Sequence, residues 1–128
     1  MEKFSMDATS RTPALLLDPA AQTLEIKGES YPEDVRSFYG MIAEKLSHYF
    51  GAEPSALTVN IKLTYFNSSS ARALMEMLDQ LEEAASDDLR VIVNWYCDPD
   101  DDITREFAED IASEVSNVSV SILDLDAD

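Results

Sequence analysis

Nine consecutive residues, 57–65, alternate strictly between apolar and polar side chains. The apolar positions are Leu57, Val59, Ile61, Leu63 and Tyr65, and the positions between them are Thr58, Asn60, Lys62 and Thr64. Because successive side chains of a β-strand point to opposite faces of a sheet, this period of two predicts a strand with one buried and one solvated face. The segment does not fit a sheet covered by helices on both faces, since the strands of such sheets are apolar throughout.

Strand and helix patterns alternate on both sides of this segment. Strands are predicted at 13–17, 22–27, 89–96 and 118–122, and a helix is predicted in each of the last three connections between strands. Ser30 and Glu33 fit a capping box at the start of the first helix. The apolar stripe of the second helix is read as Ala71, Leu74, Met75, Leu78, Leu81 and Ala85, and that of the third as Ile103, Phe107, Ile111 and Val115.

The predicted order β-β-α-β-α-β-α-β indicates an α/β fold with right-handed crossovers and a mostly parallel sheet. Polar residues recur on one face of several strands, as at Glu25, Asn60 and Asn94. The helices are therefore expected mainly on the other face, which gives a two-layer sandwich. The chain reads as a single domain over residues 1–128, with mobile ends at 1–12 and 125–128.

The net charge of −17 restricts the partners of the chain. Phosphate backbones and anionic lipids would repel such a protein, so neither nucleic acid nor a membrane surface is expected to bind it. No apolar run approaches the length of a membrane span, and the first twelve residues lack the apolar segment of a signal peptide. A single cysteine, Cys97, cannot form an internal disulfide, which favours the cytoplasm.

Three serines, Ser68–Ser70, stand where the alternating strand gives way to the second helix, directly after Asn67. One function of this run is capping, because Asn and Ser side chains accept hydrogen bonds from the free N–H groups of a helix start. A second is nucleophilic catalysis, which needs a histidine held against the hydroxyl. The only histidine, His48, is expected on the surface of the first helix, and no G-x-S-x-G motif is present. We therefore expect no catalytic residues and no enzyme activity.

A third function is the attachment of a phosphate. A phosphoryl group on the first residue of a helix meets unpaired N–H groups and the positive end of the helix dipole. Arg72 lies one turn after Ser68 and is a candidate neighbour of that phosphate, although Glu76 competes for it. On a chain this acidic, the added charge is expected to repel a docked partner more than to recruit one.

Other candidate sites are weaker. Residues 98–109 match an EF-hand loop at several acidic positions, but Ile103 stands where the loop needs glycine, so an acidic helix start is favoured over a calcium site. Cys97 is expected to be structural, and Met77 lies off the predicted apolar stripe, where a partner could contact it. No metal site and no cofactor are predicted.

Several segments together resemble the SiaC-type regulatory phosphoproteins, small bacterial domains similar in fold to STAS domains and anti-anti-sigma factors. They are T-P-A at 12–14, G-E-S-Y-P-E-D at 28–34, L-x-Y-F-N-S-S-S at 63–70 and M-x-x-L-D-x-L-E-E-A at 75–84. In that family the residue after the asparagine is the phosphorylated hydroxyl, usually threonine. The resemblance thus implies phosphorylation of Ser68, with Asn67, Ser69, Ser70 and Arg72 shaping the loop around it.

The resemblance also implies partners and a role. The implied partners are a protein Ser/Thr kinase, a PPM-type phosphatase and an effector that binds only the unphosphorylated form. By analogy with the family, the expected effector is a diguanylate cyclase. Such a switch would act in cyclic-di-GMP and biofilm regulation. A second hypothesis of another class is a carrier of small anionic metabolites or lipids, as some proteins of similar topology are. A deep apolar cavity would favour the carrier.

Overall fold

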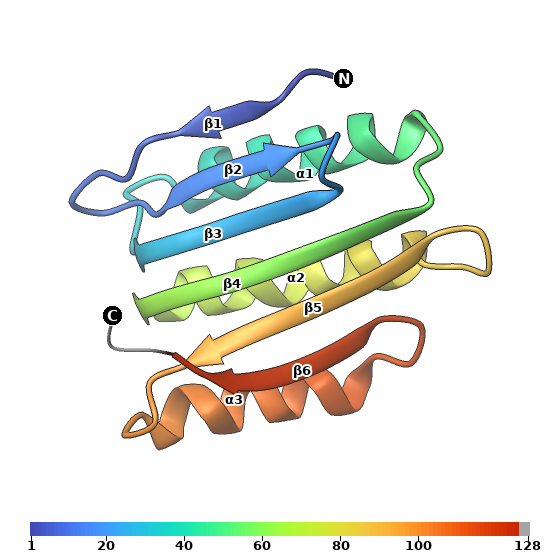
Figure 1. The fold of residues 1–128 in the computed structure, drawn as a ribbon. Helices are drawn as coiled ribbons and strands as arrows, with labels where there is room; N and C mark the ends of the chain where they lie inside the picture. Colours follow the sequence, from blue (N-terminus) through green and yellow to red (C-terminus); the bar gives the residue numbers. More distant parts are fainter. Residues whose placement is uncertain (126–128) are drawn as a thin grey trace.

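The computed structural model describes residues 1–125 and builds them into one sheet with three helices (Figure 1). The strands, in chain order and in sheet order alike, are β1 (Phe4–Met6), β2 (Ala14–Asp18), β3 (Thr23–Ser30), β4 (Ala56–Phe66), β5 (Arg90–Cys97) and β6 (Ser119–Asp124). The helices are α1 (Val35–Gly51), α2 (Ser68–Ala84) and α3 (Asp102–Glu114). Strands β1 to β3 pair antiparallel and β3 to β6 pair parallel.

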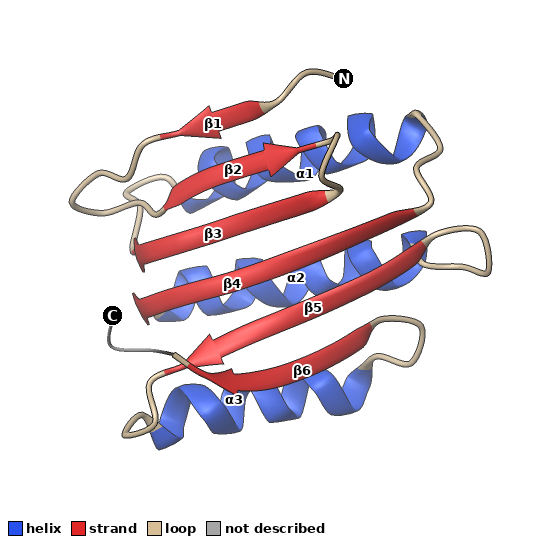
Figure 2. Ribbon diagram, viewed as in Figure 1, coloured by secondary structure: helices blue, strands red, loops and turns tan. Residues whose placement is uncertain are grey.

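All three helices lie on one face of the sheet (Figure 2), which confirms the two-layer α/β prediction. The alternation along β4 explains this arrangement. Leu57, Val59 and Ile61 are fully buried, on the face that the helices cover. The opposite face is polar, and there Lys62 pairs with Glu25 of β3 at 3.3 Å. Asn94 also donates to Asn60 across strands at 3.1 Å, and a polar face of this kind needs no second layer to cover it.

The N-terminal segment is the first correction. Residues 1–12 were expected to be mobile, but β1 extends the sheet by pairing Phe4 with Leu17. Phe4 packs against the core, and the ammonium group of Lys45 lies 4.5 Å from the centre of its ring. Phe4, Ser5 and Met6 alternate over only three residues, a run too short for the sequence pattern to predict a strand. At the other end the N–H of Leu125 donates to Cys97 O at 2.7 Å, and 126–128 lie outside the described residues.

The predicted capping box of α1 is wrong. The N-cap is Asp34, whose carboxylate accepts the N–H of Ser37 at 3.1 Å, and hydrogen bonds from Ser37 hold the pKa of Asp34 below its ordinary value. Ser30 is still part of β3 and is fully buried, while Glu33 forms an exposed ion pair with Arg11. Because β3 continues to Ser30, this residue is too far from the first helical turn to cap it.

The apolar stripes of α2 and α3 also differ from the prediction. Met77 is buried at 5% exposure, and Met75 is 40% exposed. The stripe runs instead through Ser70, Leu74, Met77, Leu78 and Leu81, a regular i, i+4, i+7, i+8, i+11 pattern. Met77 is therefore a core residue and not the solvent-facing contact that the sequence suggested. In α3, Ile103 was expected to pack inward but is 82% exposed.

Glu82 of α2 holds the turn between α3 and β6. Its carboxylate accepts backbone N–H groups from Ser116 at 2.9 Å, Asn117 at 2.8 Å and Val118 at 3.0 Å. The N–H of Ser116, followed by those of Asn117 and Val118, lowers the pKa of Glu82. The carboxylate thus ties α2 to the last strand of the sheet.

We expect Glu82→Gln to destabilise the chain at pH 7 and to have a smaller effect at pH 3. The pKa of Glu82 in the folded chain lies below the ordinary value of 4.5. The ionised carboxylate therefore stabilises the fold fully at pH values above 4.5. This stabilisation is lost as the pH falls through the pKa of the folded state. Urea unfolding at both pH values, followed by circular dichroism, measures the difference. Exposed Glu83 provides the control, since Glu83→Gln removes the same charge beside it. Equal effects of both substitutions at pH 7 would contradict the assigned contact.

Candidate functional site

The turn from β4 into α2 is built around Asn67. Its side-chain oxygen accepts the N–H of Ser70 at 2.9 Å, and its own N–H donates to Ser30 O at 3.2 Å. Asn67 is extended, with φ −86° and ψ 178°, as an N-cap requires. The predicted cap is therefore present, and α2 begins at Ser68 with its first turn fixed to the end of β3.

The three serines lie in different environments. Ser68 and Ser69 are exposed, whereas Ser70 is fully buried. The hydroxyl of Ser30 donates to Ser70 Oγ at 2.9 Å and is hydrogen-bonded to the Tyr39 hydroxyl at 2.7 Å. Burial raises the pKa of Tyr39 above its ordinary value, so this group stays a neutral phenol. The hydrogen bonds between these hydroxyls link β3, α1 and α2. Because Ser70 is fully buried, a modifying enzyme cannot reach its hydroxyl.

A shallow hollow of about 360 Å³ lies beside Ser68, between the β4–α2 turn and the start of α3. Its lining combines Asn67 and Ser68 with Thr64, Tyr65, Phe66, Ala71, Asp101, Ile103, Thr104 and Phe107. Tyr65 is 52% exposed and Ile103 is 82% exposed. Exposed apolar side chains grouped around a polar site are typical of protein contact surfaces. We call this feature the α3-side hollow.

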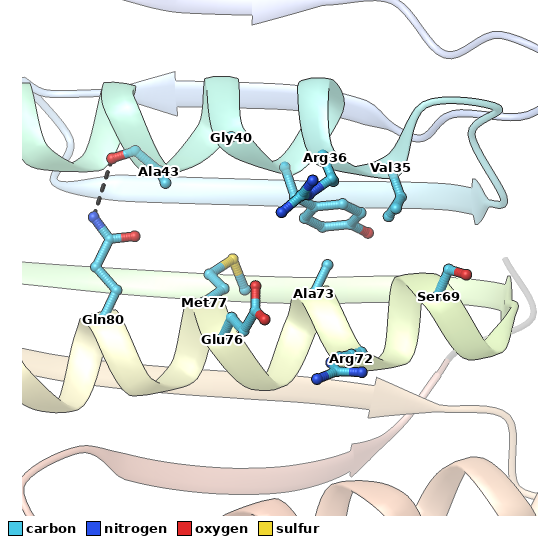
Figure 3. Close-up of a pocket in the computed structure, with 11 residues that line it drawn as sticks. Val35, Arg36, Gly40, Ala43, Ser69, Arg72, Ala73, Glu76, Met77 and Gln80 are labelled. Atoms are coloured by element: carbon cyan, nitrogen blue, oxygen red, sulfur yellow. Dashed lines mark hydrogen bonds between the residues drawn. The ribbon is translucent and has the colours of Figure 1, made fainter.

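A second, larger groove lies on the other side of the same turn, between α1 and α2 (Figure 3). We call it the α1–α2 groove; its volume is about 530 Å³. Ser69 and Arg72 of α2 line it together with Arg36 of α1, and exposed Gly40 leaves its wall open. Gln80 limits it at the far end, where its amide donates to Ala43 O at 3.0 Å.

The structure thus separates residues that the sequence placed in one loop. Ser68 faces the α3-side hollow, whereas Ser69 and Arg72 line the α1–α2 groove. Sequence reasoning missed Tyr65 and Ile103, because their positions in the strand and helix patterns indicated core residues. It also missed Arg36, which no pattern distinguishes from other surface arginines.

The weaker candidates stay separate from this site. His48 is exposed in α1, and Cys97 is fully buried. Asp101 is the N-cap of α3; hydrogen bonds from the hydroxyl and N–H of Thr104 lower the pKa of its carboxyl. Within residues 1–125, no three His, Cys, Asp or Glu side chains cluster in a way that could hold a metal ion. Over the same residues, no helix is both long enough and apolar enough to cross a bilayer.

We expect Asn67→Ala to destabilise the chain by about 1 kcal/mol, because it leaves the N–H of Ser70 without its acceptor. Urea unfolding measures the loss. Asn67→Ser is the matched control, since serine caps helices nearly as well as asparagine. If alanine and serine had the same effect, the cap would not be the cause.

Comparison with known proteins places these features in one family. A family model described as "SiaC family regulatory phosphoprotein" matches residues 6–125. An uncharacterized protein of Pseudomonas aeruginosa (strain UCBPP-PA14) is 30% identical over 116 residues, which cover 91% of this chain and 92% of that protein.

Two solved structures have the same fold. The crystal structure of apo-SiaC from Pseudomonas aeruginosa superposes with a TM-score of 0.85 at 29% identity, covering 96% of this chain and 99% of that one. The crystal structure of the diguanylate cyclase SiaD in complex with its activator SiaC, from the same organism, gives a TM-score of 0.88 at 29% identity, with 95% and 99% coverage. The family model spans nearly the whole chain, and the similarity in sequence and fold extends over the same length. The chain belongs to the SiaC family of regulatory phosphoproteins.

Proposed function

We propose that the chain is a cytoplasmic partner switch without enzyme activity of its own. In its unphosphorylated form it binds and activates a diguanylate cyclase. A protein Ser/Thr kinase ends this interaction by phosphorylating Ser68, and a PPM-type phosphatase restores it. The choice of effector is supported by a relative, because SiaC of Pseudomonas aeruginosa is the activator in a complex with the diguanylate cyclase SiaD.

The observation that carries the proposal is the position of Ser68. Its side chain is exposed at the first residue of α2 and lines the apolar α3-side hollow. A kinase can therefore reach the hydroxyl without unfolding the helix. The free N–H groups of the first turn stabilise a phosphate at this position, so modification leaves the fold intact.

The same position explains how a phosphate would prevent binding. A partner that covers Tyr65 and Ile103 must also remove water from the adjacent Ser68. A phosphate adds nearly two negative charges there, and Asp101 already lines the hollow. Burying such a charge without a cationic partner is strongly unfavourable. The unphosphorylated chain is accordingly the binding form.

The carrier hypothesis receives less support. Small-molecule sites are typically enclosed clefts of several hundred cubic ångströms. The apolar hollow under Phe4, Leu15 and Ile42 has a volume of only about 10 Å³, close to the size of one water molecule. The α3-side hollow and the α1–α2 groove are large enough but lie open on the surface.

The test compares the chain before and after phosphorylation. A SiaD-type diguanylate cyclase from the organism that makes this chain is titrated with each form of the chain. Binding of the cyclase and its synthesis of cyclic-di-GMP are measured together. We expect the unphosphorylated chain to bind and to raise synthesis, and the phosphorylated chain to do neither. Phosphatase treatment should restore both. Equal binding by the two forms would refute the switch, and no binding by either would refute the choice of effector.

A further inference from the structure

Two serines form a hydrogen bond inside the core, directly behind the turn from β4 into α2. Ser30 at the end of β3 and Ser70 in the first turn of α2 are both fully buried. No other Ser, Thr, Asn, Gln or charged side chain within residues 1–125 is buried. The hydroxyl of Ser30 donates to Ser70 Oγ at 2.9 Å. We call this contact the hydroxyl bridge.

The hydroxyl bridge contributes direction more than stability. Replacing both partners of a buried hydrogen bond by apolar groups of similar shape costs little stability, because no polar group then has to be removed from water. Two alanines could therefore hold β3 against α2 nearly as well. They would not fix the distance and direction between the two side chains, since hydrophobic contacts are not directional.

The hydroxyl bridge closes a ring of three hydrogen bonds around the start of α2. The N–H of Asn67 donates to Ser30 O at 3.2 Å, and the Asn67 side-chain oxygen accepts the N–H of Ser70 at 2.9 Å. Residues 67 and 70 are thus both tied to one residue of β3. Ser68 lies between them with its side chain exposed, so its backbone is held from both sides.

We infer that the hydroxyl bridge places the Ser68 hydroxyl for phosphoryl transfer, which makes Ser30 and Ser70 positioning residues of this reaction. The inference rests on the proposed function. In the transfer, Ser68 Oγ forms a bond to the γ-phosphorus of ATP and the bond from that phosphorus to ADP breaks. The hydroxyl proton passes to a base of the kinase. The attacking oxygen has to lie in line with the leaving ADP, at about 3–3.5 Å from the phosphorus.

The fold has to supply this geometry because Ser68 cannot adjust to the kinase by itself. Its backbone belongs to α2, so only rotation about χ1 moves the hydroxyl independently of the helix. The position of the first turn relative to the docked kinase therefore sets where the oxygen lies. A displacement of about 1 Å at a reacting group can lower a rate about a hundredfold. Loss of the bridge would permit such a displacement while the exposed docking surface stays the same.

The experiment measures phosphorylation of the full-length chain by its purified kinase, at saturating ATP and with the concentration of the chain varied. Ser70→Ala removes the bridge and is expected to lower kcat about tenfold while KM stays within about twofold of wild type. Tyr39→Phe is the matched control, because it removes a buried hydroxyl bonded to the same Ser30 but leaves the bridge in place. Its kcat should stay within about twofold of wild type. Equal kcat values for the two variants, or a change confined to KM, would overturn the inference.

A triple variant separates positioning from stability. Ser30→Ala, Tyr39→Phe and Ser70→Ala together remove all three hydroxyls, so none of these groups is left buried without a partner. Urea unfolding is expected to give a stability closer to wild type than that of Ser30→Ala alone, whereas kcat should remain as low as in Ser70→Ala. If kcat recovered together with stability, the bridge would be only structural and the inference would be wrong.

The outcome for the wild-type chain distinguishes this inference from the proposed function. If the kinase places no phosphate on Ser68 of the wild type, the proposed function fails and the inference fails with it. If the wild type is phosphorylated there and Ser70→Ala is phosphorylated with the same kcat, only the inference fails. Intact-protein and tandem mass spectrometry measure both the rate and the modified residue.

Discussion

Replacing Ser68 with alanine is expected to abolish phosphate incorporation by the cognate kinase, while binding to the cyclase is retained. The hydroxyl is exposed at the helix start, and its removal takes away the acceptor without touching a buried contact. Alanine is also a good helix former, so α2 keeps its length. Intact-protein mass spectrometry after incubation with kinase and ATP measures the effect as loss of the phosphorylated species.

Ser69→Ala is the matched control, because Ser69 is the adjacent exposed serine but lines the α1–α2 groove and not the α3-side hollow. It should be phosphorylated at the wild-type rate. Ser68→Asp should weaken cyclase binding, though less than phosphate does, since one carboxylate carries a single charge. Full phosphorylation of Ser68→Ala together with its loss in Ser69→Ala would move the site by one residue.

Replacing Trp95 with alanine is expected to lower the free energy of unfolding by about 3–5 kcal/mol. Trp95 is fully buried in β5, and its ring packs edge-to-face against Phe107 of α3 at 5.8 Å between centroids. Phe107 in turn packs against Phe66 at 5.4 Å, and both of these rings line the α3-side hollow. The cavity left by alanine would therefore loosen the wall beside Ser68 as well as the core. Urea unfolding followed by far-ultraviolet circular dichroism measures the loss, because Trp95 is the only tryptophan.

Trp95→Phe is the control for this prediction. Within the described residues the indole N–H has no hydrogen-bond acceptor, so phenylalanine removes an unsatisfied donor while it keeps most of the aromatic contact. Its effect should be much smaller than that of alanine. Similar losses in both variants would show that the ring contacts with Phe107 are not what stabilises this region.

The fold could be predicted because its main signal is local. The alternation over 57–65 and the helical spacing after Asn67 report which face of each element is buried, and that information was enough for a two-layer α/β sheet. β1 was missed because its contribution comes from one side chain, Phe4, whose partner Leu17 follows thirteen residues later. The capping box at Ser30 failed for a similar reason. The hydroxyl of Ser30 bonds to Ser70 and Tyr39, contacts that no short motif records.

The site could be predicted only in part. The motif N-S-S-S identified the turn and the cap, but it does not show that Ser70 is buried while Ser68 is exposed. That difference depends on the direction of α2 relative to β3. Ile103 shows the reverse error: its spacing suited the core, yet in the first turn of α3 it is exposed to solvent. Where a helix contributes only one turn of apolar spacing, the position of that turn in the tertiary structure decides whether a side chain is exposed.

The three-residue β1 strand has a consequence for how the molecule behaves when crowded. A sheet edge offers unpaired N–H and C=O groups on which another chain can add a strand, and short edge strands limit such addition. By covering β2 with only Phe4–Met6, the chain leaves few main-chain groups for intermolecular pairing. The chain is thereby protected against aggregation by strand addition along that border.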